Sequence, residues 1–255
     1  MKGTYVLRIL RGHPGHQYWE EFEFQRLASA NIISALMEIQ RNPVNRKGAH
    51  VAPVVWDSGC LEEVCGSCSM LVNGKPRQAC TAIIDVIIEQ TGSTTITIAP
   101  LSKFPLVRDL IVDRSRMFDN LKEVSAWIEA DDSRDVGSGP KISQEKQEVM
   151  YALSQCMTCG CCLEACPQVN SHSNFIGPAA IAQVRLFNTH PIGSFQKPKR
   201  LHVMMEDGGV GDCGNAQNCV RVCPKNLPLT DAIAAIGRDV TLQAIKDIFS
   251  LPERE

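Results

Sequence analysis

The stretch Cys156–Pro167 reads CMTCGCCLEACP and places five cysteines within eleven residues. A second run, Cys213–Pro224 (CGNAQNCVRVCP), has the same length and also ends in Cys-Pro. Iron–sulfur runs of the form C-x2-C-x2-C-x3-C-P give their fourth cysteine to the other of two clusters. The two runs therefore predict a pair of clusters that exchange one ligand each.

The same spacing assigns every cysteine of the two runs except one. In the second run the template position 216 is an alanine, which cannot bind iron. The first cluster then has four thiolates and is predicted to be [4Fe–4S], with ligands Cys156, Cys159, Cys162 and Cys223. The second has three, which predicts a [3Fe–4S] cluster lacking one corner iron, with ligands Cys166, Cys213 and Cys219. Cys161 is surplus, and we expect a small buried residue near the cluster there.

A third group of cysteines precedes these runs, in CLEEVCGSCSMLVNGKPRQAC. Its spacing, C-x4-C-x2-C-x11-C, is typical of a plant-type [2Fe–2S] cluster, whose two irons require four thiolates. Structural zinc is the alternative, but zinc loops usually pair one C-x2-C with another. Gly66 would allow the loop backbone to approach the inorganic sulfides. The predicted [2Fe–2S] ligands are Cys60, Cys65, Cys68 and Cys80.

The composition is that of a globular protein with an unusual amount of cysteine. Of 255 residues, 44% are hydrophobic and twelve are cysteine, and the net charge of −2 gives no reason to expect nucleic acid. The start of the chain, MKGTYVLRILRG, has neither an apolar signal core nor twin arginines, and no run approaches the ~20 apolar residues of a membrane span. In a reducing cytosol, many cysteines indicate metal sites rather than disulfides.

The pattern of residues 1–105 predicts strands with one helix. Two strands, Tyr5–Leu10 and Glu20–Phe24, flank a Gly/Pro/His loop, and Thr94–Ile98 alternates like a third. Asn73-Gly74 is a strong hairpin signal. The strands expected around it are Met70–Val72 and Gln78–Ile83, and the expected amphipathic helix is Ala30–Gln40.

The rest of the chain reads as helical. We expect helix over most of Leu106–Ala130, a polar linker at Asp131–Pro140, and further helices at Ser143–Cys156 and Leu229–Phe249. The predicted domains are 1–105 with the [2Fe–2S] cluster, 106–142 as helical connection and linker, and 143–255 with the other two clusters.

Two small charged groups also allow predictions. Arg108 and Asp109 are expected to form a structural pair. Lys197, Lys199 and Arg200, in QKPKRL, form a basic group that would meet anionic headgroups or a membrane anchor, with a solvated loop as the equal alternative.

These motifs resemble the iron–sulfur subunit of succinate dehydrogenase or fumarate reductase, in particular the bacterial type that has a cytochrome b anchor. The resemblance covers nearly the whole chain, and it is specific because the three cluster motifs occur in this order with the alanine gap in the third. The stretches that carry it, besides the double run, are WDSGCLEEVCGSCSMLVNGKPRQAC (56–80), PLSKFPLVRDLIVD (100–113) and FIGPAAIAQVRL (175–186). It implies an α+β protein, with an N-terminal β-grasp plant-type ferredoxin domain and a C-terminal all-α bacterial-type ferredoxin domain.

The resemblance also implies partners and a function. Electrons would pass from covalent FAD in a flavoprotein subunit that oxidises succinate, through [2Fe–2S], [4Fe–4S] and [3Fe–4S], to quinone in a cytochrome b anchor that often holds haem b. The chain would be peripheral on the cytoplasmic side of the cell membrane. It would carry no catalytic residue of its own, since the sequence has no P-loop, no dinucleotide motif and no Ser-His-Asp candidate.

One departure from the family concerns the quinone. Members that reduce ubiquinone usually have a tryptophan soon after the Cys-Pro that matches Cys166-Pro167, and a histidine directly after the cysteine that matches Cys213. Here the first stretch is QVNSHSN and the second position is Gly214. Menaquinone is therefore our hypothesis.

The sequence also allows alternative functions for the chain. The same subunit would serve a fumarate reductase running in reverse, or another flavin dehydrogenase. A self-contained enzyme would use the three-iron site as a Lewis acid, although three clusters in one small chain favour an electron wire. A redox-sensing regulator would need a DNA-binding or effector segment, for which the sequence offers no candidate.

Overall fold

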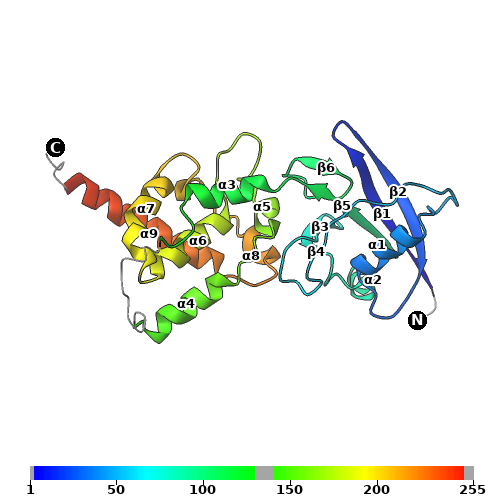
Figure 1. Ribbon diagram of the computed structural model, residues 1–255, viewed down its shortest axis with the longest axis horizontal. Coiled ribbons are helices and arrows are strands. Elements are labelled where there is room, and N and C mark those ends of the chain that lie inside the picture. Colours follow the sequence, from blue (N-terminus) through cyan, green and yellow to red (C-terminus); the bar gives the residue numbers. More distant parts are fainter. Residues whose placement is uncertain (1–2, 130–140, 250–255) are drawn as a thin grey trace. The chain divides into compact units, whose positions relative to one another are not determined.

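The computed structural model describes residues 3–129 and 141–249, and it forms two compact units (Figure 1). Unit 1 comprises Met1–Arg114 and Met157–Ala165, and unit 2 comprises Ser115–Cys156 and Cys166–Glu255. Most of the first ferredoxin-like cysteine run is thus grouped with the N-terminal part of the chain. The predicted linker Asp131–Pro140 lies outside the described residues.

Unit 1 is built on a mixed five-stranded sheet. Its order is β2-β1-β5-β3-β4, with β1 parallel to β5 and the other neighbours antiparallel. The three strands expected near Tyr5, Glu20 and Thr94 are confirmed. The bounds are β1 (Thr4–His13), β2 (His16–Gln25), β3 (Ser69–Val72), β4 (Lys75–Gln78) and β5 (Thr95–Ala99).

Two helices supply apolar side chains to the core of unit 1. The predicted helix is confirmed as α1 (Ile32–Arg41), which begins with a capping box between Asn31 and Ser34 and buries Leu36 and Ile39. A second helix, α2 (Ile84–Thr91), was not predicted, because its short sequence IDVIIEQT is apolar enough to resemble a buried strand. Both helices pack with alternate residues of the strands in one hydrophobic core.

The hairpin around Asn73-Gly74 is confirmed, but its second strand lies earlier than predicted. Asn73 and Gly74 have φ values of 48° and 73°, so both central turn residues are left-handed, as a tight two-residue turn requires. Such a turn makes Lys75 pair directly with Val72. The second strand is therefore β4 (Lys75–Gln78), and the prediction of strand over Gln78–Ile83 is wrong.

The helix predicted to begin at Leu106 is wrong in its first part. The chain instead forms a small hairpin of β6 (Leu106–Arg108) and β7 (Ile111–Val112), followed by α3 (Ser115–Glu123). Asp109 forms the turn with a φ of 47°. A helix is excluded there because the turn is held by a tertiary contact that the local sequence does not reveal.

That contact also corrects the predicted ion pair. The Asp109 carboxylate accepts hydrogen bonds from the backbone N–H groups of Gly12 and Val55, both at 2.8 Å, and pairs with Arg11, 3.3 Å away. The structure therefore gives Asp109 the partner Arg11 rather than Arg108. Arg11 also pairs with Glu20, so a buried guanidinium lies between two carboxylates.

The regular elements in the described part of unit 2 are all helices. Helix α6 (Pro178–Thr189) contacts α4 (Gln144–Ser154), α7 (Lys197–Met205) and α9 (Leu229–Phe249) (Figure 1). The predicted helices at Ser143–Cys156 and Leu229–Phe249 are confirmed. Ser143 caps α4 by accepting the Lys146 N–H. The shorter elements of unit 2 are α3, η1 (Gly193–Gln196), η2 (Val210–Asp212) and α8 (Asn218–Val222).

Arg200 is not part of a surface basic group. Its side chain is 0% exposed, and its guanidinium donates to the carbonyl oxygens of Ser125, Trp127 and Gly193 and to the side-chain oxygens of Asn188 and Gln196. Burial lowers the pKa of Arg200, with Glu129 acting in the opposite direction. Of the other members of the predicted group, Lys199 is exposed and Lys197 is partly exposed.

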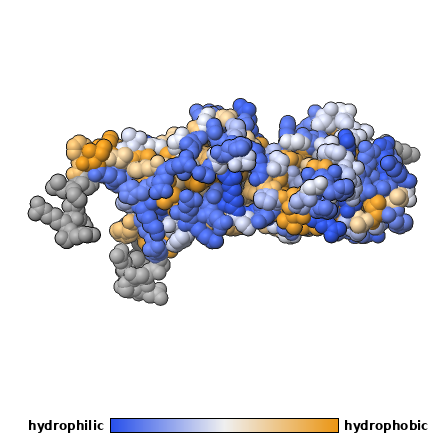
Figure 2. Space-filling view, turned by 90° about the horizontal axis from the view of Figure 1, so that it is seen from above, coloured by the Kyte–Doolittle hydropathy of each residue, from blue (hydrophilic) through white to orange (hydrophobic). Residues whose placement is uncertain are grey.

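The end of α9 carries exposed apolar residues. Leu242, Ile245, Ile248 and Phe249 are between 47% and 81% exposed. Figure 2 shows hydrophobic residues gathered at this end of the helix. In the described ranges 3–129 and 141–249, no helix combines the length and the hydropathy needed to cross a bilayer.

Candidate iron–sulfur centres

The loop that follows Cys60 wraps its backbone around one sulfur. The Sγ of Cys60 accepts hydrogen bonds from the N–H groups of Glu62, Val64 and Cys65, at 3.3, 3.2 and 3.3 Å. Leu61 has a φ of 61°, which turns the following amides toward the sulfur. Several N–H···S hydrogen bonds to one sulfur stabilise a thiolate, the form in which cysteine binds iron.

The four cysteines of this group lie as two pairs. The N–H of Cys60 donates to the Sγ of Cys65 at 3.4 Å, and Cys68 lies within hydrogen-bonding reach of Cys80. Hydrogen bonds from the Cys60 N–H and from Ser67 lower the pKa of Cys65 to about 6, whereas burial raises that of Cys68 to about 11. Two pairs of thiols fit a centre of two irons, each of which takes two protein ligands.

Gly66 brings this loop against the first ferredoxin-like cysteine run. It has a φ of +73°, and a Cβ there would lie 2.8 Å from the Cα of Cys159. Arg114 donates to the Gly66 carbonyl oxygen at 2.7 Å. A hydrogen bond with the Cys161 side chain is the main cause that lowers the pKa of Cys159 to about 7, and the charge of Arg114 makes a smaller contribution. Gly66 is thus required by the close approach of two cysteine loops, a reason that the sequence alone did not provide.

Glu164 fastens the short helix α5 (Cys161–Ala165) inside unit 1. Its carboxylate is 7% exposed and accepts three hydrogen bonds, from the N–H and the hydroxyl of Ser102 and from the N–H of Lys103, at 3.0, 2.5 and 3.0 Å. A buried carboxylate is stable when its oxygens are satisfied in this way. The helix follows Cys159, so the anchor also positions the cysteines beside it.

Cys161, the surplus cysteine, is completely buried and has a polar neighbour. Its Sγ accepts a hydrogen bond from the side-chain amide of Gln78 at 3.5 Å, and the other end of that amide lies 3.6 Å from the Sγ of Cys68. Gln78 is 0% exposed and also donates to Ser69. Contact with Cys159, together with burial, raises the pKa of Cys161 far above its ordinary value. The expectation of a buried residue is confirmed, and the link through Gln78 is new.

In unit 2, three predicted ligands line a single small cavity. Cys166, Cys213 and Cys219 surround it together with Ala216. Burial raises the pKa of Cys219, and the nearby charges of Cys166 and Cys213 add to this effect. Three thiols around one space, with an alanine where a fourth would stand, fit a cluster with three iron ligands.

The four predicted [4Fe–4S] ligands are divided between the two units. In unit 1, Cys159 and Cys162 are buried and both lie near Cys161. In unit 2, Cys223 accepts a hydrogen bond from the N–H of Leu227 at 3.5 Å. The assignment of Cys156 and Cys223 to the same cluster as Cys159 and Cys162 stays a prediction.

None of the twelve cysteines forms a disulfide. Within residues 3–129 and 141–249, no three His, Cys, Asp or Glu side chains converge as the ligands of a single metal ion would. The ligand sets above therefore depend on cysteine spacing, on shared cavities and on hydrogen bonds to sulfur.

The sequence interpretation missed Gln78, Glu164 and Arg114. Each is an ordinary polar residue whose importance comes from a contact with a distant segment. The stretch PLSKFPLVRDLIVD contains the Ser102 and Lys103 amides that Glu164 binds. Neither this stretch nor the cysteine run that contains Glu164 indicates, by its own sequence, that the two segments are in contact.

Two protein-family models match parts of the chain. Residues 6–119 match the 2Fe-2S iron-sulfur cluster binding domain, and residues 152–227 match the 4Fe-4S dicluster domain. The succinate dehydrogenase iron-sulfur subunit of Bacillus subtilis is 58% identical over 232 residues, which cover 91% of this chain and 90% of that protein. The fumarate reductase iron-sulfur subunit of Wolinella succinogenes is 29% identical and covers 87% of this chain and 89% of its own length.

A solved structure supports the fold. A chain of the Mycobacterium smegmatis Sdh1 complex in the apo form superposes with a TM-score of 0.81 and 21% sequence identity, covering 96% of this chain and 98% of that one. The chain belongs to the family of succinate dehydrogenase and fumarate reductase iron–sulfur subunits. It is an electron-transfer subunit of an oxidoreductase complex, and its cofactors are [2Fe–2S], [4Fe–4S] and [3Fe–4S] clusters.

Proposed function

We propose that this subunit carries electrons from the FAD of a flavoprotein that oxidises succinate to menaquinone in a cytochrome b anchor. The single observation that carries the succinate direction is the similarity to the Bacillus subtilis succinate dehydrogenase subunit, at 58% identity, against 29% for the Wolinella succinogenes fumarate reductase subunit. The alternative is the same subunit in a fumarate reductase running in reverse.

The proposed ligands are the eleven cysteines of the three motifs. Cys60, Cys65, Cys68 and Cys80 hold [2Fe–2S], supported by their arrangement in two pairs and by the N–H donors around Cys60. The cavity that they line supports Cys166, Cys213 and Cys219 as [3Fe–4S] ligands. Spacing supports Cys156, Cys159, Cys162 and Cys223 as [4Fe–4S] ligands. The clusters supply one-electron chemistry, and the chain contributes ligation, burial and hydrogen bonds that set each potential.

The finer fold follows the same proposal. Residues 1–105 form a β-grasp plant-type ferredoxin domain, supported by the mixed sheet and its covering helices. Residues 106–142 connect it to an all-α bacterial-type ferredoxin domain, 143–255. The exposed apolar end of α9 supports a partner subunit that covers it. We place the assembled protein on the cytoplasmic side of the membrane, held through its anchor.

Electron paramagnetic resonance of the purified complex at poised potentials tests the ligand sets. The oxidised wild-type complex should give a near-isotropic [3Fe–4S] signal, and the reduced complex a [2Fe–2S] signal. Ala216→Cys supplies the missing thiolate and should replace the three-iron signal with that of a four-iron cluster. Ala216→Val, which adds bulk without a ligand, is the control and should keep the three-iron signal. A wild-type complex without that signal when oxidised would contradict the assignment around Ala216.

The quinone requires a separate experiment. Gly214 lies where a Cβ would meet the side chain of Gln168 at 2.5 Å, so Gln168 takes space beside this position. A histidine at 214 would require Gln168 to move, which supports a quinone site different from that of the ubiquinone-reducing members. Extraction of the purified complex should yield menaquinone, and ubiquinone as the sole quinone would refute this part of the proposal.

A further inference from the structure

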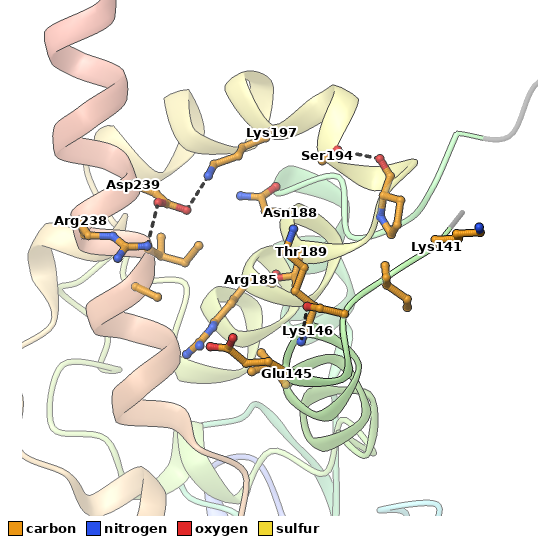
Figure 3. Close-up of a pocket in the computed structure, with 16 residues that line it drawn as sticks. Lys141, Glu145, Lys146, Arg185, Asn188, Thr189, Ser194, Lys197, Arg238 and Asp239 are labelled. Carbon is orange, nitrogen blue, oxygen red and sulfur yellow. Dashed lines mark hydrogen bonds and ion pairs between the residues drawn. The ribbon is translucent and has the colours of Figure 1, made fainter. Parts of the chain in front are cut away.

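A large pocket in unit 2 has no role in the proposed electron path. Its volume is about 600 Å³, and it is lined by residues of α4, α6, α7 and α9 (Figure 3). Pockets of roughly 300–1,000 Å³ are typical of small-molecule sites. None of the eleven proposed iron ligands lines it. We call it the basic pocket.

The charged side chains of the basic pocket are mainly positive. Among the residues that the structure describes, its carboxylates are Glu145 and Asp239, and its cations are Lys141, Lys146, Arg185, Lys197 and Arg238. Asp239 already pairs with Lys197 at 2.7 Å and with Arg238 at 3.7 Å. Like charges that converge on one space repel one another, so the excess of cations favours a negatively charged ligand.

Asn188 gives the pocket an unpartnered hydrogen-bond donor. The side chain is 9% exposed, and its Nδ2 has no hydrogen-bond partner among the described residues. Leaving a buried donor unsatisfied costs about 1–3 kcal/mol. Figure 3 shows the nitrogen end of Asn188 pointing toward the side of the pocket where Lys197 and Asp239 lie.

Buried Arg200 fixes the direction of this amide. Its Nη1 donates to the Oδ1 of Asn188 at 3.1 Å. Arginine has no acceptor, so only the oxygen end of the amide can face it. The Nδ2 group therefore faces away from Arg200, in the direction that Figure 3 shows, and a rotation of the amide that exchanged nitrogen and oxygen would place two donors against each other.

We propose that the basic pocket binds a small polyanion that carries two or more phosphate or carboxylate groups. One oxygen of the ligand accepts the free N–H of Asn188, and the surrounding lysine and arginine side chains neutralise its charge. Both kinds of group accept hydrogen bonds without donating, which is what a donor-rich pocket requires. This binding is separate from electron transfer, because the pocket contains no proposed cluster ligand.

Two substitutions separate this proposal from general attraction to a basic surface. Asn188→Asp keeps the oxygen that Arg200 binds but places a negative oxygen where the free N–H stood. Arg185→Gln removes one pocket cation for which no ion pair is found among the described residues. Lys199→Gln is the matched control, because Lys199 lies on α7 with Lys197, is 59% exposed and does not line the pocket.

The probe is inorganic triphosphate, titrated calorimetrically into the purified complex at low salt. We expect one saturable site in the wild-type complex, at least about tenfold weaker binding in Asn188→Asp, weaker binding in Arg185→Gln, and no change in Lys199→Gln. Citrate should compete for the same site. If Asn188→Asp does not assemble, the comparison of Arg185→Gln with Lys199→Gln decides. No saturable binding to the wild type, or equal binding by the pocket variants and the control, would overturn the proposal.

Discussion

Replacement of Glu164 by alanine should loosen the first ferredoxin-like cysteine run without removing a ligand. In the structure the Glu164 carboxylate accepts three hydrogen bonds from Ser102 and Lys103 in a nearly buried setting. Each hydrogen bond to a charged group stabilises the folded state by about 1.5–3 kcal/mol. The loss in the variant is smaller than the sum of the three, because the freed donors can form hydrogen bonds with water instead. We expect the opening of this contact to become easier by about 3 kcal/mol, a value at the low end for breaking a buried charged contact.

Hydrogen–deuterium exchange of the assembled complex measures this opening directly, because the Ser102 and Lys103 amides are the donors. A change of about 3 kcal/mol corresponds to exchange faster by about a hundredfold in peptides that cover residues 102–103. Glu148→Ala, an exposed glutamate on α4, is the control and should leave that exchange unchanged. Equal exchange rates in the two variants would refute the anchoring role of Glu164.

Three further predictions follow from buried polar groups of unit 1. Asp109→Ala removes the acceptor for two backbone N–H groups and one ion-pair partner of buried Arg11. The free energy of unfolding should therefore fall by about 3–5 kcal/mol. An unchanged midpoint in chemical denaturation would contradict this prediction. Gln78→Glu introduces negative charge near the Sγ of Cys68, which lies 3.6 Å from the Gln78 amide oxygen in the structure. The negative charge should lower the midpoint potential of the [2Fe–2S] cluster, measured by a redox titration followed by paramagnetic resonance. An equal or higher midpoint potential would contradict this prediction. Burial raises the pKa of Tyr5 to about 12, with a contribution from Asp85, so the folded state favours the neutral phenol. The free energy of unfolding should therefore fall as the pH rises from 10 toward 12, and Tyr5→Phe should weaken this alkaline loss, whereas the same loss in both proteins would contradict the prediction.

Local patterns predicted part of the regular structure of unit 1, namely β1, β2, α1, β3 and β5. Strand β1 and helix α1 were recognisable because their apolar residues repeat with the period of the element that buries them. Asn73-Gly74 predicted its hairpin because the turn needs two left-handed residues. The errors occurred where a distant contact decides the local conformation: the turn at Asp109 exists because its carboxylate binds the backbone of Gly12 and Val55.

The candidate iron–sulfur centres also have some features that the sequence predicted and others that only the structure revealed. By itself, the sequence determined which cysteines are potential ligands and that Ala216 leaves one position empty, because cluster ligation depends on the number and spacing of thiolates. Only the tertiary structure decided that residues 157–165 pack with the N-terminal part of unit 1, through Gly66, Gln78 and Glu164. Such contacts join segments that are far apart in the chain, and their side chains show no local pattern. Their stabilising effect arises from burial and hydrogen bonding that exist only after folding.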